Sequence, residues 1–392
     1  MTAGTDTDTG EGGGRSGALD VVAYHHHPVK APLLHEVMLP LAASCAADGL
    51  AAHVERHWLH GPHLRLRLQG RPDLVETAAG AAAERIRTWL RANPSRSGLT
   101  PAELLARAAE AGRAELVPPP HGPIEPDNTV RVAPVDRAPL RALLGEDGAG
   151  LREELLRAGL GALEAGAAFL VGRADGADSA PARLQLAVAA LAAHAGAHPG
   201  GLAGAHYSYV SHLEDFLVHD DVDGRVRARF EQHAERAGAA ATALVGRVCG
   251  GGAQGWERAW ADFSAGAWEL ARARHEAGAD LRGDPLAYRA RAAATGDAAA
   301  AERWNPEVRT RYSEFHRLLA RSDPRGAMWS RPDYLIHRVA TNALYRLLAL
   351  CDVRPLERYL AAHLVVRAVP ALTGCDWRTE IGAAIAVVER GA

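Results

Sequence analysis

Two arginines stand one strand repeat apart within residues 57–68. Successive side chains of a β-strand point to opposite faces, so His63, Arg65 and Arg67 share one face. The three leucines between them share the other face, which is typical of a strand that packs on a core. Two guanidinium groups held in this way form a rigid binding site for a carboxylate or another oxyanion. The alternative is the solvated face of a half-buried strand, and the pattern alone leaves both open.

A second polar stretch combines an acid and an imidazole at helical spacing. Asp333, His337 and Thr341 recur every four residues, so a helix places them on one stripe, and Tyr345 follows one turn later. A carboxylate one turn before a histidine can hold it as an imidazolium or orient it for proton transfer. The alternative is a partly buried helix histidine whose ring nitrogens are satisfied by its neighbours.

The sequence lacks the motifs of several other kinds of binding or catalytic site. The three consecutive histidines at 25–27 cannot all point to one side of a strand, so we expect a structural or surface role for them. The four cysteines lie far apart without a CxxC pair, which predicts neither a metal site nor a disulfide framework. The sequence has no P-loop, no G-x-G-x-x-G after a strand and no G-x-S-x-G elbow. We therefore expect no cofactor.

Charge and composition narrow the class of protein further. A formal net charge of -3 gives no broad attraction to nucleic acid. Lys30 is the only lysine, and the preference for Ala, Gly and Arg is typical of the GC-rich genomes of actinobacteria. Hydrophobic residues make up 48% of the chain, yet no run of about 18 apolar residues predicts a membrane helix. The polar N-terminus lacks the features of a signal peptide, so we expect a cytoplasmic protein.

The first third of the chain predicts a small sheet. Residues 1–18 are polar and Gly-rich, and we expect a disordered leader there. The following pattern predicts a strand at 19–26, a helix at 31–47, strands at 51–59 and 63–68, and a helix at 73–92. This β-α-β-β-α order predicts a small antiparallel sheet backed by helices. Thr100 and Glu103 form the pattern of a capping box for another helix, and residues 130–132 predict one more strand.

The rest of the chain predicts helices almost throughout. We expect them at residues 151–171, 181–195, 206–219, 225–249, 256–275, 306–320, 332–351, 355–369 and 377–390. Residues 278–303 are rich in Ala, Gly and Arg and predict a loop. The fold class is therefore α+β, with the N-terminal sheet packed on a larger helical part, and residues 19–392 form a single domain.

Several segments resemble one family. Residues 61–67, with the sequence GPHLRLR, resemble a signature of the lantibiotic dehydratase C-terminal domain family. Residues 209–212, 337–345 and 353–358, together with His363, are similar to later segments of its small members. The resemblance covers most of residues 19–370. This family includes the glutamate-elimination domains of class I lantibiotic dehydratases and small proteins of thiopeptide biosynthesis, so the resemblance implies a tailoring enzyme of a ribosomally made peptide.

The resemblance also implies roles for individual residues. In the elimination domains, a pair of arginines and a late histidine act on glutamylated Ser or Thr, and these map to Arg65, Arg67 and His337. Guanidinium groups can stabilise the enolate that α-proton removal creates, and the histidine can relay a proton as glutamate leaves. Two elimination signatures are missing, however. An Arg-Tyr-Gly-Gly stretch is replaced around residues 122–128, and the Asn-Arg after the late histidine is Asn342-Ala343.

Both departures resemble the pyridine synthases of thiopeptide pathways. These join two dehydroalanines by a formal [4+2] aza-cycloaddition and then lose water and the leader peptide. The resemblance implies that the enzyme mainly positions two distant ends of one peptide, which removes a large entropic barrier, with His337 or Tyr334 as an acid. We favour this macrocyclase. A glutamate-elimination lyase is the alternative, and a third hypothesis is a non-catalytic partner whose sheet binds the leader by adding a strand.

The candidate site residues fall into a catalytic set and a substrate-binding set. The candidate catalytic residues are Arg65, Arg67, Tyr334 and His337. The candidate substrate-binding residues are His63, His212, Asn342 and Tyr345. The expected partners are the precursor peptide, with its leader and core, and a separate glutamylating dehydratase, and a homodimer stays open. A common site requires that the two strand arginines converge with the imidazole of His337 in one cavity.

Overall fold

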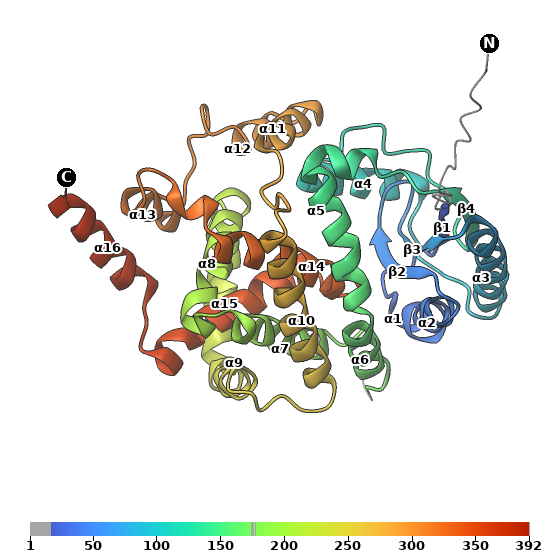
Figure 1. Cartoon of the computed structure of the whole chain (residues 1–392), viewed down its shortest axis with the longest axis horizontal. Coiled ribbons are helices and arrows are strands. Elements are labelled where there is room, and N and C mark those ends of the chain that lie inside the picture. Colours follow the sequence, from blue (N-terminus) through green and yellow to red (C-terminus); the bar gives the residue numbers. More distant parts are fainter. Residues whose placement is uncertain (1–16, 174–175, 177, 392) are drawn as a thin grey trace, which may run out of the picture.

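A four-stranded antiparallel sheet stands at one end of the molecule, and helices form the rest (Figure 1). The computed structural model describes residues 17–173, 176 and 178–391. The strand order is β2-β3-β1-β4, and the strands are β1 (Gly17–Tyr24), β2 (Ala51–His57), β3 (His63–Gly70) and β4 (Thr129–Pro134). The α+β class and the β-α-β-β-α start predicted from the sequence are confirmed.

Helices cover the apolar face of this sheet. The chain between β1 and β2 forms one continuous helical segment made of α1 (Ala31–Leu33), a π-helical turn η1 (Leu34–Met38) and α2 (Leu39–Ala47). After β3 follow α3 (Pro72–Ala92) and α4 (Pro101–Glu115), and α4 begins with the predicted capping box of Thr100 and Glu103. The three leucines of β3 are fully buried in the core between the sheet, α2 and α3, as the strand alternation predicts.

The larger part of the chain is helical. Its elements are α5 (Ala138–Ala158), α6 (Leu160–Val171), α7 (Ala180–Ala197), α8 (Gly201–Asp220), α9 (Arg225–Cys249), α10 (Trp256–Glu276), α11 (Pro285–Ala294), α12 (Ala298–Arg303), α13 (Glu314–Ser322), the 3-10 turn η2 (Ala327–Ser330), α14 (Pro332–Leu350), α15 (Pro355–Thr373) and α16 (Trp377–Gly391). Helix α5 stands between the sheet and the remaining helices (Figure 1). No helix in the described part of the chain is long and apolar enough to cross a membrane.

Two segments differ from the sequence prediction because short polar residues start helices there. Residues 278–303 were expected to form a loop, but they contain α11 and α12. The Asp284 carboxylate accepts the N–H of Leu286, and the Asp297 carboxylate accepts the N–H of Ala300, so each aspartate caps a helix of mostly alanine. The helix expected at 306–320 begins only at Glu314, because the Ser313 hydroxyl caps it there.

Two other boundaries are also corrected. The helix expected at 151–171 is two helices that meet at Gly159, where an added Cβ would lie 2.4 Å from Cδ1 of Leu347. A larger residue at this junction would therefore have to displace the buried Leu347 side chain of α14. Residues 17 and 18 of the expected leader belong to β1, and the rest of that leader lies outside the described residues.

The polar face of the sheet is buried against α5, not solvated. Arg67 on β3 donates to both oxygens of the Asp20 carboxylate on β1, each at 2.9 Å. Its Nη1 donates to Oε1 of Glu153 on α5 at 3.0 Å and lies 3.5 Å from Oε1 of Glu55 on β2. All four side chains are buried. One guanidinium group therefore ties three strands to the helix that connects the sheet with the helical part.

A cluster of three histidines lies inside the helical part. The rings of His194 on α7 and His337 on α14 stack with centroids 4.4 Å apart, and His198 meets His337 edge-on at 5.1 Å. Nε2 of His194 lies 2.8 Å from Oγ1 of Thr341, one turn beyond His337. Burial lowers the pKa of His194 to about 3 and holds the pKa of His337 well below its usual value. The cluster is therefore neutral near pH 7.

A single lysine amine is also buried in the fold. Lys30, just before α1, has no exposed surface, and its Nζ donates to the carbonyl oxygens of His25 and His27. Burial lowers the pKa of this amine to about 7. The Lys30 N–H donates to the Asp352 carboxylate at 2.8 Å, so the turn after β1 is attached to the end of α14.

Replacing Arg67 by methionine should strongly destabilise the protein. The variant would leave the carboxylates of Asp20 and Glu153 buried without their shared cation, and breaking a buried pair in this way costs about 3–5 kcal/mol. Urea denaturation would measure the loss in the free energy of unfolding. Arg71→Ala is the matched control, because its ion pair with Asp73 is exposed, and it should change stability little. An equal stability of both variants would contradict the structural role of Arg67.

The histidine cluster should make stability fall as the pH drops below about 6.5. An unfolded chain protonates His194 near its usual pKa of 6.5, whereas the folded protein resists protonation down to about 3. Stability is therefore complete above pH 6.5 and is lost as the pH falls between these values, by up to about 1.4 kcal/mol per pH unit for each such group. His194→Phe keeps a stacked ring without a titratable group, so its free energy of unfolding should fall less between pH 7 and pH 5.

Thr341→Val is the control for this pH dependence. It removes the hydroxyl that contacts His194 but keeps the imidazole, so it should lower stability by a similar amount at both pH values. Thermal unfolding of the three proteins at pH 7 and pH 5 would separate the two effects. Parallel losses in the wild type and in His194→Phe would show that this imidazole does not govern acid sensitivity.

Candidate functional site

Helix α14 presents two different polar stripes. His337, Thr341 and Tyr345 follow each other at four-residue spacing, and the first two of these side chains are buried among α7 and α8. A second stripe starts at Tyr334 and continues through Arg338, Asn342 and Arg346, with Asn342 and Arg346 exposed. Nine residues separate His337 from Arg346, which corresponds to two and a half turns of an α-helix. His337 and Arg346 therefore point to opposite sides, whereas the two stripes as a whole are offset by one residue, or about 100° around the helix, and lie side by side.

An arginine cluster lies where the second stripe meets the sheet. It consists of Arg65 on β3, Arg152 on α5 and Arg346 on α14, gathered around the buried carboxylate of Glu55 on β2. Nη2 of Arg65 lies 3.2 Å from Oε2 of Glu55, and Nη1 of Arg152 lies 3.3 Å from Oε1. Although burial opposes it, the charges of Arg152 and Arg65 hold the pKa of Glu55 well below its usual value.

The arginine cluster carries an excess of positive charge. The charge of Arg152 is the largest of the causes that lower the pKa of Arg346 to about 10, and Arg65 acts in the same direction. Glu55 and, more weakly, Glu115 oppose this repulsion. An exposed guanidinium group under such repulsion gains from an added anion or from the oxygen atoms of a polar ligand. The cluster is thus suited to bind carboxylates or peptide carbonyl groups.

Two tyrosine hydroxyls lie along the second stripe of α14, and Tyr334 stands about 18 Å along the helix from Arg346. Tyr334 lies at the first turn of α14 and meets Trp329 edge-on at 5.1 Å. Tyr288 on α11 stacks on Trp304, and the positive charges of Arg338 and Arg346 act to lower the pKa of its hydroxyl. Burial raises the pKa of both tyrosines, so both hydroxyls stay protonated near pH 7 and can donate a hydrogen bond.

Two of the predicted residues on β3 are committed to the protein itself. All donors of Arg67 described above face carboxylates of the sheet and α5. His63 is buried, stacks on His57 at 5.7 Å, and its Nδ1 lies 2.9 Å from the Gly61 carbonyl oxygen. Burial lowers the pKa of His63 to about 3, so it is neutral. Arg65 is the member of this strand that reaches the arginine cluster.

The histidines around His337 lie apart from the arginine cluster. Both ring nitrogens of His337 are buried and have no hydrogen-bond partner among the described residues. Nearby, Nδ1 of His212 on α8 lies 3.1 Å from the hydroxyl of Tyr345, whose ring lies under the guanidinium group of Arg358. Within the described chain, no contact joins His337 to Arg65 or Arg67. His337 packs instead on the rings of His194, His198 and Tyr209, so the expected convergence of these three side chains is not observed among the described residues.

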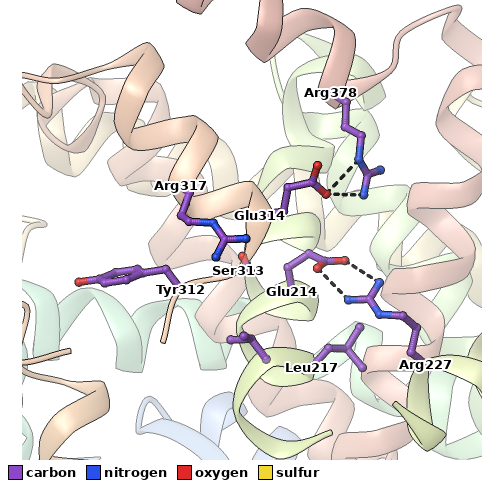
Figure 2. A pocket seen from close by; sticks show the side chains of 9 residues that line it. Glu214, Leu217, Arg227, Tyr312, Ser313, Glu314, Arg317 and Arg378 are labelled. Atoms are coloured by element: carbon purple, nitrogen blue, oxygen red, sulfur yellow. Dashed lines mark hydrogen bonds and ion pairs between the residues drawn. The ribbon is translucent and has the colours of Figure 1, made fainter. Parts of the chain in front are cut away.

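A pocket of about 350 Å³ lies elsewhere, between α8, α9, α13 and α16 (Figure 2). Two ion pairs close its sides, Glu214 with Arg227 and Glu314 with Arg378, each with a shortest N–O distance of 2.9 Å. Arg317 points into the same space and has no ionic partner in the described part of the chain. None of the residues predicted from the sequence lines this pocket.

Arg152, Arg346 and Tyr288 were not among the residues predicted from the sequence. The four-residue spacing of Tyr334, Arg338, Asn342 and Arg346 was a usable signal, but the prediction followed the neighbouring stripe of His337. No pattern could have placed Arg152 or Tyr288, since they come from other helices. Within the described residues, no group of three or more His, Cys, Asp or Glu side chains is arranged to hold a metal ion.

Comparison with solved structures shows the same fold in two proteins. One is described as "Pyridine synthase, TbtD, from thiomuracin biosynthesis", with 20% sequence identity and a TM-score of 0.65 over 91% of this chain and 99% of that one. The other, TsrL, has 16% identity and a TM-score of 0.58 over 94% of this chain and 98% of that one. The comparison with curated proteins gives no match.

A family model identifies the chain itself. The model described as "Lantibiotic biosynthesis dehydratase C-term" matches residues 19–369. The match includes the sheet except for the first two residues of β1, the arginine cluster and α14, so it covers every site residue considered above. It confirms the family expected from the motif at residues 61–67. The chain therefore belongs to the lantibiotic biosynthesis dehydratase C-terminal family.

Proposed function

We propose that this protein is a macrocyclase that acts on a ribosomally made peptide. In this proposal it joins two dehydroalanines by a formal [4+2] aza-cycloaddition, and the ring then becomes a pyridine by loss of water and the leader peptide. The family and the near-complete structural overlap with a pyridine synthase support an enzyme of thiopeptide type. The choice of cyclisation over glutamate elimination rests on the geometry of α14.

The observation that carries this choice is the separation of Arg67 and His337 from the arginine cluster. Elimination, as the family resemblance implies it, needs two arginines and the late histidine around one substrate. Here Arg67 is held by buried carboxylates, and His337 is buried against the rings of His194 and His198. Ala343, which replaces an arginine of the elimination signature, is 2% exposed in the core. An arginine side chain would not fit at that position without displacing its neighbours.

The exposed stripe of α14 is suited to positioning a peptide. Arg65, Arg152 and Arg346 can bind carbonyl oxygens of a chain that would otherwise sample many conformations, and holding its two ends together removes much of the entropic barrier. Tyr334 can donate a hydrogen bond from its protonated hydroxyl, and this would favour the imidic-acid form of the amide that reacts. No metal or cofactor is needed for these steps.

A direct assay separates cyclisation from elimination. The purified protein is given a precursor that already contains two dehydroalanines and, separately, a glutamylated precursor. We expect mass spectrometry to show release of the leader and a macrocycle in the first reaction, and no loss of glutamate in the second. Glutamate loss alone would instead identify a lyase. Binding without conversion of either precursor would identify a non-catalytic partner.

Replacing Arg346 by alanine should reduce cyclisation without unfolding the protein. The side chain is exposed, and its loss relieves repulsion with Arg152, so stability should be kept or slightly increased. The loss of a charged hydrogen bond to substrate should lower kcat/KM by about tenfold or more. Arg317→Ala, which removes an exposed arginine from the separate pocket of Figure 2, is the matched control and should keep full activity. Equal rates for the two variants would rule out the arginine cluster as the substrate site.

A further inference from the structure

Among the described residues, no further strand pairs with the outer edge of β4. On the other side, β2 is packed by α2, α5 and α14. Strand β4 pairs with β1 alone, in the register Leu19↔Pro134 to Tyr24↔Thr129. An unpaired strand edge is a template for a further strand, and folds usually protect it with prolines, charges or a covering segment. The chemistry of this edge therefore decides what it can accept.

The phase of the β1–β4 ladder identifies the free backbone groups. The N–H of Val135 donates to the carbonyl oxygen of Ala18, and this pair continues the register of β4. Hydrogen-bonded pairs alternate along antiparallel strands, so residues 129, 131 and 133 face β1, whereas Val130 and Val132 direct their N–H and C=O groups outward. The contact of Arg87 with the Val130 carbonyl oxygen, at 3.4 Å, agrees with this phase. Pro134 has no N–H to offer, so the open edge is short.

A groove runs beside this open edge. It has a volume of about 470 Å³ and lies between the end of α3 and the start of β4. Its lining residues are Arg87, Leu90, Arg91, Pro94, Asn128, Thr129 and Val130. The lining combines apolar surface with two guanidinium groups and contains no acidic side chain. Val132, the next outward residue on β4, is 42% exposed.

The two arginines of the groove are available to a ligand. Arg91 has only the Thr88 hydroxyl as a side-chain partner among the described residues. Arg87 pairs with Glu84, but both side chains are exposed, and such a pair is weak and easily exchanged. A carboxylate on an added strand could bind either guanidinium group while its backbone pairs with β4. The groove therefore matches an acidic segment in extended conformation.

We propose that the outer edge of β4 binds a short, acidic, extended segment of the peptide substrate by strand addition. This inference rests on the proposed function in one respect, namely that the substrate is a peptide. The backbone of the segment would pair with Val130 and Val132, and its acidic side chains, all on the face toward α3, would enter the groove and meet Arg87 and Arg91. The segment would hold the peptide at the sheet, apart from the arginine cluster where the reaction takes place.

A single substitution tests the backbone part of this proposal. Val132→Pro removes an outward N–H but leaves the ladder to β1 intact, and proline is tolerated in edge strands. Val132→Thr keeps the N–H and is the matched control. The probe is a fluorescein-labelled heptapeptide in which valine and glutamate alternate, and fluorescence anisotropy measures its binding. We expect the proline variant to bind at least about tenfold more weakly than the wild type and the threonine variant. Equal binding by all three proteins, or no binding by the wild type, would overturn the proposal.

The charge of the probe and of the groove gives a second test. A heptapeptide with lysine in place of glutamate should bind the wild type at least about tenfold more weakly, and Arg91→Glu should reverse this preference. Unchanged preference in that variant would exclude the groove as the binding site. Size-exclusion chromatography checks a different occupant, because a dimer that Val132→Pro converts to a monomer would mean that β4 pairs with a second copy. These readouts measure peptide binding alone. Loss of binding at β4 is therefore distinguishable from loss of cyclisation of a full precursor, because either one can occur without the other.

Discussion

The arrangement of the whole molecule depends on the buried guanidinium group of Arg67. It neutralises carboxylates from β1 and α5 and lies beside a third from β2, so the polar face of the sheet can be covered by a helix instead of by water. Charged groups tolerate such burial only when their partners are fixed and close. The same network fixes the position of α5 on the sheet. Arg152 of α5 and Arg65 of β3 then meet at the common carboxylate of Glu55, and this junction creates the arginine cluster.

Helix α14 separates two environments of opposite character. One stripe places His337 in the buried interior beside His194, where burial disfavours any positive charge. The other stripe places Arg346 beside Arg152 and Arg65, where repulsion between the cations favours the arrival of a negative or strongly polar ligand. The interior stripe packs the helix into the core, and the exposed stripe contributes Arg346 to the arginine cluster.

Much of the fold was predictable from the sequence because local patterns determine it. Strand alternation in β3, the capping box at Thr100 and the β-α-β-β-α order were all confirmed. The helices α11 and α12 were missed, although Asp284 and Asp297 are ordinary helix caps, because Gly and Arg suggested a loop. The site was harder to predict, since β2, β3, α5 and α14 contribute to it from distant parts of the chain. A strand pattern puts Arg65 and Arg67 on one face, but it cannot tell which of them a later helix will cover.

The burial of Lys30 has a practical consequence for the study of this protein. The surface carries its positive charge on arginines, and the only lysine in the sequence lies inside the turn that joins β1 to the end of α14. Its amine, with a pKa of about 7, would be a good nucleophile if a reagent could reach it. The rate at which an amine-selective reagent acylates Lys30 would therefore measure how often this turn opens. It would report local unfolding at the junction of the sheet and the helices.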